Sequence, residues 1–133
     1  MAIIGILAAI AIPNLLRAQR RAKDSRAYTD TKQIVSQAQV YALDNNILPP
    51  EANMPPLLWD KSVPGNTVYM AATYDPWGAT STTNYLYQED TGTGLTAEIM
   101  AYSTGVNKAG AWTIGGACSG NAVGYSSQFG SCP

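Results

Sequence analysis

The N-terminal stretch of the chain is MAIIGILAAIAIPNLL, residues 1–16, and it contains no charged side chain. As a helix it would be roughly 24 Å long at about 1.5 Å per residue, whereas a bilayer core is about 30 Å thick and needs about 20 apolar residues. The run is therefore slightly short for a full span. We expect it to be the C-terminal part of a longer membrane helix whose beginning has been removed, with Met1 as a new start.

Two other interpretations of this run compete with a membrane helix. A secretory signal has its basic residues before the apolar stretch, but here they follow it within ten positions, as Arg17, Arg20, Arg21, Lys23 and Arg26. The core helix of a soluble protein has one apolar stripe, but residues 1–16 are apolar on every face. A helix that meets a bilayer or other helices on all sides is therefore favoured.

Pro13 puts a constraint on this helix. Inside a helix, proline removes one backbone hydrogen bond and clashes with the carbonyl four residues earlier, here that of Ala9. We expect a bend or an unwound turn at this position.

Residues 17–46 are predicted to continue the helix with an amphipathic pattern. A moderately apolar stripe recurs at steps of three and four residues, made of Ala27, Thr31, Ile34, Val35, Ala38, Tyr41 and Ala42. The sequence Asp44-Asn45-Asn46 favours a helix end, and Pro49-Pro50 excludes continuation. The helix thus has two parts: residues 17–46 pack on their own globular domain, and residues 1–16 need a bilayer or other copies of themselves.

The rest of the chain changes character twice. Residues 47–66 contain five of the eight prolines and are predicted to form a loop with one helical turn at 57–61. Residues 67–103 contain three runs rich in Tyr, Val, Thr and Ile, at 67–74, 84–88 and 98–103, which indicate an antiparallel meander of three or four strands. Residues 104–133 are a Gly-rich loop with short strands expected at 112–114 and 122–125. The predicted fold class is α+β, with a long N-terminal α-helix packed on a small antiparallel β-sheet. Residues 17–133 would form the globular domain.

The charge of the chain is unevenly distributed. Residues 1–32 carry six basic and two acidic groups, a net charge of +4, and residues 33–133 carry two basic and seven acidic groups, a net charge of −5. The basic cluster either contacts an acidic surface of a neighbouring subunit or only marks the membrane boundary. Nucleic-acid binding is disfavoured, because the rest of the chain is acidic and contains no recognition module.

The two cysteines, Cys118 and Cys132, lie in the Gly-rich tail. A structural disulfide is the simplest interpretation in an exported protein. A metal site needs more ligands, and the chain has no histidine. A redox motif would have a shorter spacing between its cysteines.

The sequence gives little support for catalysis. Without histidine, the Ser/His/Asp and Cys/His nucleophile arrangements are excluded. No Gly-rich phosphate loop precedes a helix. We therefore expect a protein that is not an enzyme.

One short motif, Asp75-Pro76-Trp77-Gly78, predicts a rigid structural turn. The Asp side chain can accept hydrogen bonds from backbone amides two residues on. Proline fixes φ, glycine permits positive φ, and Trp77 can cap the core.

These motifs together resemble one family. The segment AIIGILAAIAIPNLLRAQ (residues 2–19) resembles the N-terminal helix of type IV pilins and of the related pseudopilins. The D-P-W-G turn, the Tyr-rich strand after it and the Tyr102-Ser103-x-Gly105 sequence are similar to the major pseudopilin of the type II secretion system. The resemblance covers most of residues 2–105. It implies the pilin fold and a filament subunit that assembles through Ile3, Ile4, Ile6, Leu7, Ile10, Ile12, Pro13, Leu15 and Leu16.

The resemblance also implies partners and a location. The protein would be processed by a prepilin peptidase and would lie in the bacterial inner membrane and periplasm or in a cell-surface filament. Its partners would be copies of itself, minor pilins or pseudopilins, and an inner-membrane assembly platform, with no nucleic acid.

The tail departs from the major pseudopilins. They hold a calcium ion in an S-x-G-x-D-G loop, but here Asn107 replaces the acidic residue and Lys108 adds a positive charge. Since calcium prefers several oxygen ligands with net negative charge, we expect no cofactor and a lost calcium site. A C-terminal loop closed by a disulfide is instead a feature of type IV pilins.

The alternative function is a membrane-anchored minor pilin, or a periplasmic binding or adhesin module, that does not itself polymerise. Aromatic side chains could line its ligand surface, although we expect them to form the core; they are Trp59, Tyr69, Tyr74, Trp77 and Trp112.

Overall fold

A computed structural model describes residues 1–62, 66–90, 98–106, 110–116 and 118–132. It consists of three layers: a long helix, a four-stranded antiparallel sheet, and the C-terminal loop on the far side of the sheet. The elements in chain order are α1 (Ala2–Asn45), the short 3-10 helices η1 (Glu51–Asn53) and η2 (Pro56–Leu58), β1 (Leu86–Glu89), β2 (Ile99–Ser103), β3 (Val123–Ser126) and β4 (Gly130–Cys132). The observed architecture is the α+β arrangement expected from the sequence.

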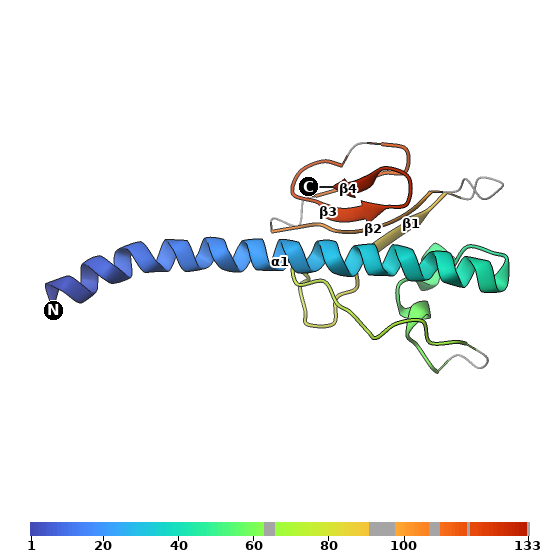
Figure 1. Cartoon of the computed structure of the whole chain (residues 1–133), viewed down its shortest axis with the longest axis horizontal. Coiled ribbons are helices and arrows are strands. Elements are labelled where there is room, and N and C mark those ends of the chain that lie inside the picture. The colour runs from blue at the N-terminus through green and yellow to red at the C-terminus, as the bar shows by residue number, and fades with distance from the viewer. Residues whose placement is uncertain (63–65, 91–97, 107–109, 117, 133) are drawn as a thin grey trace.

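Helix α1 is one uninterrupted element of 44 residues. It remains α-helical through Pro13, so the unwound turn that the sequence allowed is absent. The N-terminal turns are inclined to the axis of the remaining helix (Figure 1), which agrees with the other expectation, a bend. The helix ends as expected: Asn46 follows it in the left-handed conformation, with φ 55° and ψ 20°, which asparagine adopts more readily than most residues.

The sheet and the second part of α1 enclose the inner core. The predicted apolar stripe is the buried face of the helix: Ala27, Thr31, Ile34, Val35 and Ala38 are each at most 1% exposed. They pack with alternate residues of the strands, such as Tyr87 of β1 and Ala101 of β2. In Figure 1 the sheet covers only the second part of the helix, and the N-terminal part extends away from it.

Strand β2 separates two cores. The strand order is β1-β2-β3-β4 with antiparallel pairing throughout, and Ala101 of β2 pairs with Tyr87 and with Tyr125. All five residues of β2 are buried because both faces of the strand are covered. On the face away from the helix, Met100 and Tyr102 pack with Trp112 of the C-terminal loop in an outer core.

Two expectations for the strands were wrong, and one strand had not been expected. Residues 67–74 are extended but pair with no strand, because the amides of Tyr69 and Met70 donate to the carbonyl of Leu58. The strand expected at 112–114 is absent, and only the bridge between Ala111 and Ser119 is present there. Strand β4 was not expected, because its sequence Gly-Ser-Cys has little intrinsic β propensity.

Candidate functional site

The first part of α1 is a free apolar surface. Its large apolar side chains are between 51% and 74% exposed, and they are Ile3, Ile4, Ile6, Leu7, Ile10, Ile12, Leu15 and Leu16. Pro13 is exposed as well. The helix is long and apolar enough to cross a membrane, and none of its most apolar window is buried inside the protein. Length and composition therefore fit either a membrane anchor or a signal sequence. The exposure shows that the first part of α1, unlike the second, is not part of the core of this domain.

The basic residues that follow form a collar around the helix, which we define as Arg17, Arg20, Arg21, Lys23 and Arg26. All five are exposed. The one ion pair among the described residues joins Arg26 to Asp30, with 3.5 Å between Nε and Oδ2. The first three arginines therefore carry positive charge that no acidic side chain of the described part of the chain neutralises.

The turn at Asp75–Gly78 does more than reverse the chain direction. The indole Nε1 of Trp77 donates to Oδ1 of Asp24 at 2.9 Å, and the Lys23 ammonium lies 4.8 Å from the centre of the Trp77 ring. The turn thus holds α1 at the point where the helix leaves the globular domain, and we call this set of contacts the Trp77 clasp. Sequence reasoning predicted a turn that caps the core, but it did not identify the helix as the partner of Trp77.

The other end of this clasp is the Asp75 carboxylate. Its Oδ1 accepts hydrogen bonds from the Trp77 amide at 2.9 Å and from the Ser103 hydroxyl at 2.8 Å. Burial raises the pKa of Asp75, and the two hydrogen bonds oppose that shift. The turn is therefore tied both to the helix and to the end of β2.

Two further contacts hold the second part of α1 on the sheet. The Tyr85 hydroxyl donates to Oδ2 of Asp30 at 2.8 Å, and burial together with that carboxylate raises the pKa of Tyr85. Tyr125 of β3 packs edge-on to Tyr28, with 6.3 Å between ring centres. Both contacts fix the helix relative to the strands.

The predicted disulfide is present. Cys118 is bonded to Cys132 of β4, with 5.9 Å between their Cα atoms. The bond ties the C-terminal loop over the outer core, which contains Cys132. The position of the disulfide is therefore that of a structural bond, which holds the C-terminal loop against the sheet.

A buried carboxylate that the sequence did not single out supports the same region. Glu98 is 2% exposed, and it accepts hydrogen bonds from the Ser126 hydroxyl at 2.6 Å and from the Gly115 amide at 2.8 Å. No local pattern identifies Glu98, because its partners lie 17 and 28 residues away in the chain.

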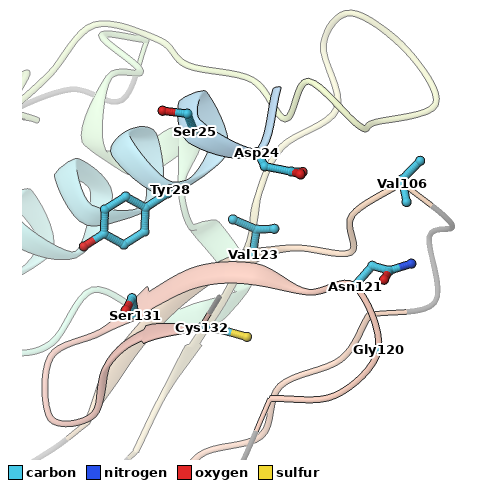
Figure 2. A pocket seen from close by; sticks show the side chains of 9 residues that line it. All are labelled: Asp24, Ser25, Tyr28, Val106, Gly120, Asn121, Val123, Ser131 and Cys132. Carbon is cyan, nitrogen blue, oxygen red and sulfur yellow. The ribbon is translucent and has the colours of Figure 1, made fainter. Parts of the chain in front are cut away.

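A pocket of about 460 Å³ lies between α1 and the C-terminal strands. Figure 2 shows Asp24, Ser25 and Tyr28 of the helix on one side and Val123 and Cys132 on the other. Its volume suits a small ligand. Two of its lining residues already have partners within the fold, because Asp24 accepts the Trp77 indole hydrogen bond and Cys132 is in the disulfide.

The aromatic residues weighed as a ligand surface do not gather in one place. Trp59 packs on Tyr74, Tyr69 packs on Tyr41 of the helix, and Trp112 lies in the outer core. Each contributes to packing within the fold, as the sequence led us to expect.

The calcium loop is only partly described. The Gly105 amide donates to the Ser103 hydroxyl, which donates to Asp75. Asn107 and Lys108 lie outside the described residues, so the loss of the calcium site stays a prediction. Among the described residues, no group of three or more Asp, Glu or Cys side chains is placed to hold a metal ion.

Comparison of the chain with family profiles, with curated proteins and with solved structures found no match. The architecture itself, an apolar N-terminal helix packed on an antiparallel sheet with a C-terminal disulfide, is compatible with a pilin-like fold.

Proposed function

We propose that the chain is a structural subunit of a type IV pilus-like or type II secretion pseudopilus filament, and that it assembles through the first part of α1. The observation that carries this proposal is a contrast within one continuous helix. The large apolar side chains of residues 3–16 are at least half exposed, whereas the stripe at residues 27–38 is buried. A contiguous apolar surface of this length marks an interaction site.

In this proposal the role is structural, without catalysis, cofactor or nucleic acid. The disulfide suits an oxidising compartment, and the apolar helix begins in the bacterial inner membrane after processing by a prepilin peptidase. The partners are other copies of the chain, minor pilins or pseudopilins and an inner-membrane assembly platform. The resemblance of residues 2–19 to pilin helices supports these assignments.

A matched pair of variants tests the proposal. Ile10 in the free helix and Phe129 in the loop before β4 are both 60% exposed. An aspartate at the centre of a membrane-inserted helix costs about 2.5–3.5 kcal/mol, and we expect a cost of the same order in the apolar interior of a helix assembly. Ile10→Asp should therefore abolish polymers that wild type forms after detergent removal, whereas Phe129→Asp should leave them unchanged. Sedimentation and electron microscopy would measure both.

The pocket between α1 and the C-terminal strands favours a second candidate. This is a membrane-anchored minor pilin, or a periplasmic binding or adhesin module, that remains a monomer. Full-length native protein that stays monomeric in vesicles at high concentration would support it and contradict the filament proposal.

A further inference from the structure

A second exposed apolar surface lies at the other end of α1. Val40, Leu43 and Ile47 are 39%, 73% and 60% exposed. Leu43 follows the buried Ile34 by nine residues, which is about two and a half helical turns, so it points away from the sheet. Val40 lies three residues before Leu43 and shares its face. No described part of the chain covers this surface.

Acidic side chains accompany these apolar ones. Asp44 and Glu51 are both exposed, and residues 33–60 contain three acidic residues and no basic one. The Glu51 amide donates to Oε1 of Glu89 at 3.3 Å, which brings a further carboxylate to this end of the molecule. We call this group of exposed residues at the C-terminal end of α1 and just beyond it the distal face: Val40, Leu43, Asp44, Ile47 and Glu51.

Residues 15–21 have the complementary composition. Leu15 and Leu16 are exposed apolar side chains, and they are followed directly by Arg17, Arg20 and Arg21, which form no ion pair with a described residue. Arg20 lies seven residues before the buried Ala27, so it is on the side of the helix that faces the sheet further along. The two surfaces therefore lie at different heights on α1, and Arg20 and Leu43 lie on opposite sides of the helix.

We propose that the distal face of one copy docks residues 15–21 of a second, parallel copy. The proposal rests on the proposed filament and names the contact that sets its register. The centres of the two segments are separated by about 25 residues, which gives an axial stagger of about 40 Å between touching copies. A contact between two different surfaces forms a ring if successive copies return to the starting position and an open filament if they do not. The axial stagger prevents that return, so this contact propagates into a filament.

The two components of this contact have different roles. Exposed ion pairs contribute little to affinity individually, so burial of the leucine, isoleucine and valine side chains supplies most of the attraction. The opposite charges select this register and reject others, because a shift would place like charges together or leave charges next to apolar side chains.

Photo-crosslinking in the assembled full chain tests the register. A photo-reactive amino acid replaces Arg20, and the protein is mixed with an isotope-labelled copy before assembly. We expect the probe to capture residues 40–51 of the labelled copy. The matched control carries the probe at Ala18, which is exposed on the opposite side of the same turn, and it should capture them much less.

Charge reversal tests the chemistry of the contact. Arg17→Glu with Arg20→Glu, or Asp44→Lys with Glu51→Lys, should each lower the polymerised fraction about fivefold, the scale that two exposed ion pairs supply. All four changes together should restore it. Ala79→Lys with Ser81→Lys, on an exposed loop, is the control and should have no effect, and the unfolding midpoint of each variant checks its folding.

The outcomes separate the two proposals. Polymers in which the Arg20 probe captures only residues 1–26, or in which the fourfold variant stays as defective as its parents, overturn the docking and leave the filament standing. Full-length native protein that forms no polymer and no intermolecular crosslink overturns both.

Discussion

The two parts of helix α1 contain similar apolar side chains but have opposite surroundings. Ile10 in the first part is 60% exposed, whereas Ile34 in the second part is fully buried against the sheet. The helix itself is continuous between them. The change occurs near Lys23 and Asp24, where the Trp77 clasp holds the helix.

The comparison shows that the apolar content of a segment does not by itself predict whether that segment is buried in the core. The buried part is the more polar of the two by sequence, with single apolar residues at steps of three and four. What buries it is the sheet, whose second strand supplies Ile99 and Ala101 to the inner core. Among the described residues no such surface covers the first part, and the filament proposal rests on the exposure of its apolar side chains.

The largest expected effect is on the stability of the globular domain, through the buried part of α1. Ile34→Ala should destabilise the globular domain by about 2–5 kcal/mol, the usual cost of removing a fully buried aliphatic side chain. Ile10→Ala is the matched control and should change stability by no more than about 0.5 kcal/mol. Urea unfolding followed by tryptophan fluorescence measures both, and equal losses would show that the first part of α1 belongs to the domain core.

The sequence predicted the helix, its buried stripe and its end, because these follow from local spacing. Steps of three and four residues identified Ala27, Ile34 and Ala38 as one face, and Asn46 ends the helix as its neighbours suggested. The disulfide was predicted because only two cysteines are available.

The parts that were missed depend on contacts distant in the chain. Residues 67–74 contain the residue types of a strand, but η2 takes the amide hydrogen bonds that a strand would need. The role of Trp77 depends on Asp24, 53 residues earlier, and β4 forms beside a neighbouring strand despite its poor propensity. None of these partners can be read from a local pattern.

The second prediction concerns the covalent link in the outer layer. Replacing Cys118 and Cys132 by serine should lower the free energy of unfolding by about 3 kcal/mol, from the chain entropy of a loop of this length. Thermal or urea unfolding would measure this. EDTA is the control treatment and should leave the wild-type midpoint unchanged, and a large drop would mean that a calcium site survives on carbonyl and Asn107 ligands.

The third prediction concerns the contact between Trp77 and α1, which lies at the boundary between the two parts of the helix. Trp77→Phe retains an aromatic ring but removes the hydrogen bond to Asp24. We expect a loss of about 1.5–3 kcal/mol in the free energy of unfolding, the contribution of a hydrogen bond to a charged group. The rate of amide hydrogen exchange should rise first in the helix around residues 23–27. Exchange that rises equally along the whole of α1 would contradict a local clasp.

The fourth prediction uses the pKa of Asp75. Burial raises it above the ordinary value of 3.8, so the folded state holds this proton more tightly than the unfolded state. The resulting stabilisation is fully present below the unfolded pKa and is lost as the pH rises through the folded pKa.

Asp75→Asn isolates this effect from that of the other carboxylates. Its side-chain oxygen can still accept from the Trp77 amide and the Ser103 hydroxyl, but it does not titrate. On lowering the pH from about 7 to about 4, wild type should gain stability relative to Asp75→Asn. Paired urea titrations measure the difference, and a constant or opposite trend would mean that the pKa is not raised.

The smallest expected effect on the domain comes from Pro13→Ala. Proline costs about 3 kcal/mol in a helix interior, so the variant should straighten the first part of α1 and increase the helical signal in circular dichroism. The stability of the globular domain should not change, because Pro13 is exposed and lies 14 residues before Ala27, the first fully buried residue of the stripe.

Asn14→Ala, at the neighbouring exposed position, controls for the gain in helix propensity without removing the bend. If the angle between the two parts of α1 is needed in the polymer, Pro13→Ala should reduce assembly much more than Asn14→Ala at an unchanged melting temperature. If Pro13→Ala instead lowers the melting temperature by many degrees and assembles normally, the division of α1 into a free part and a domain part is wrong.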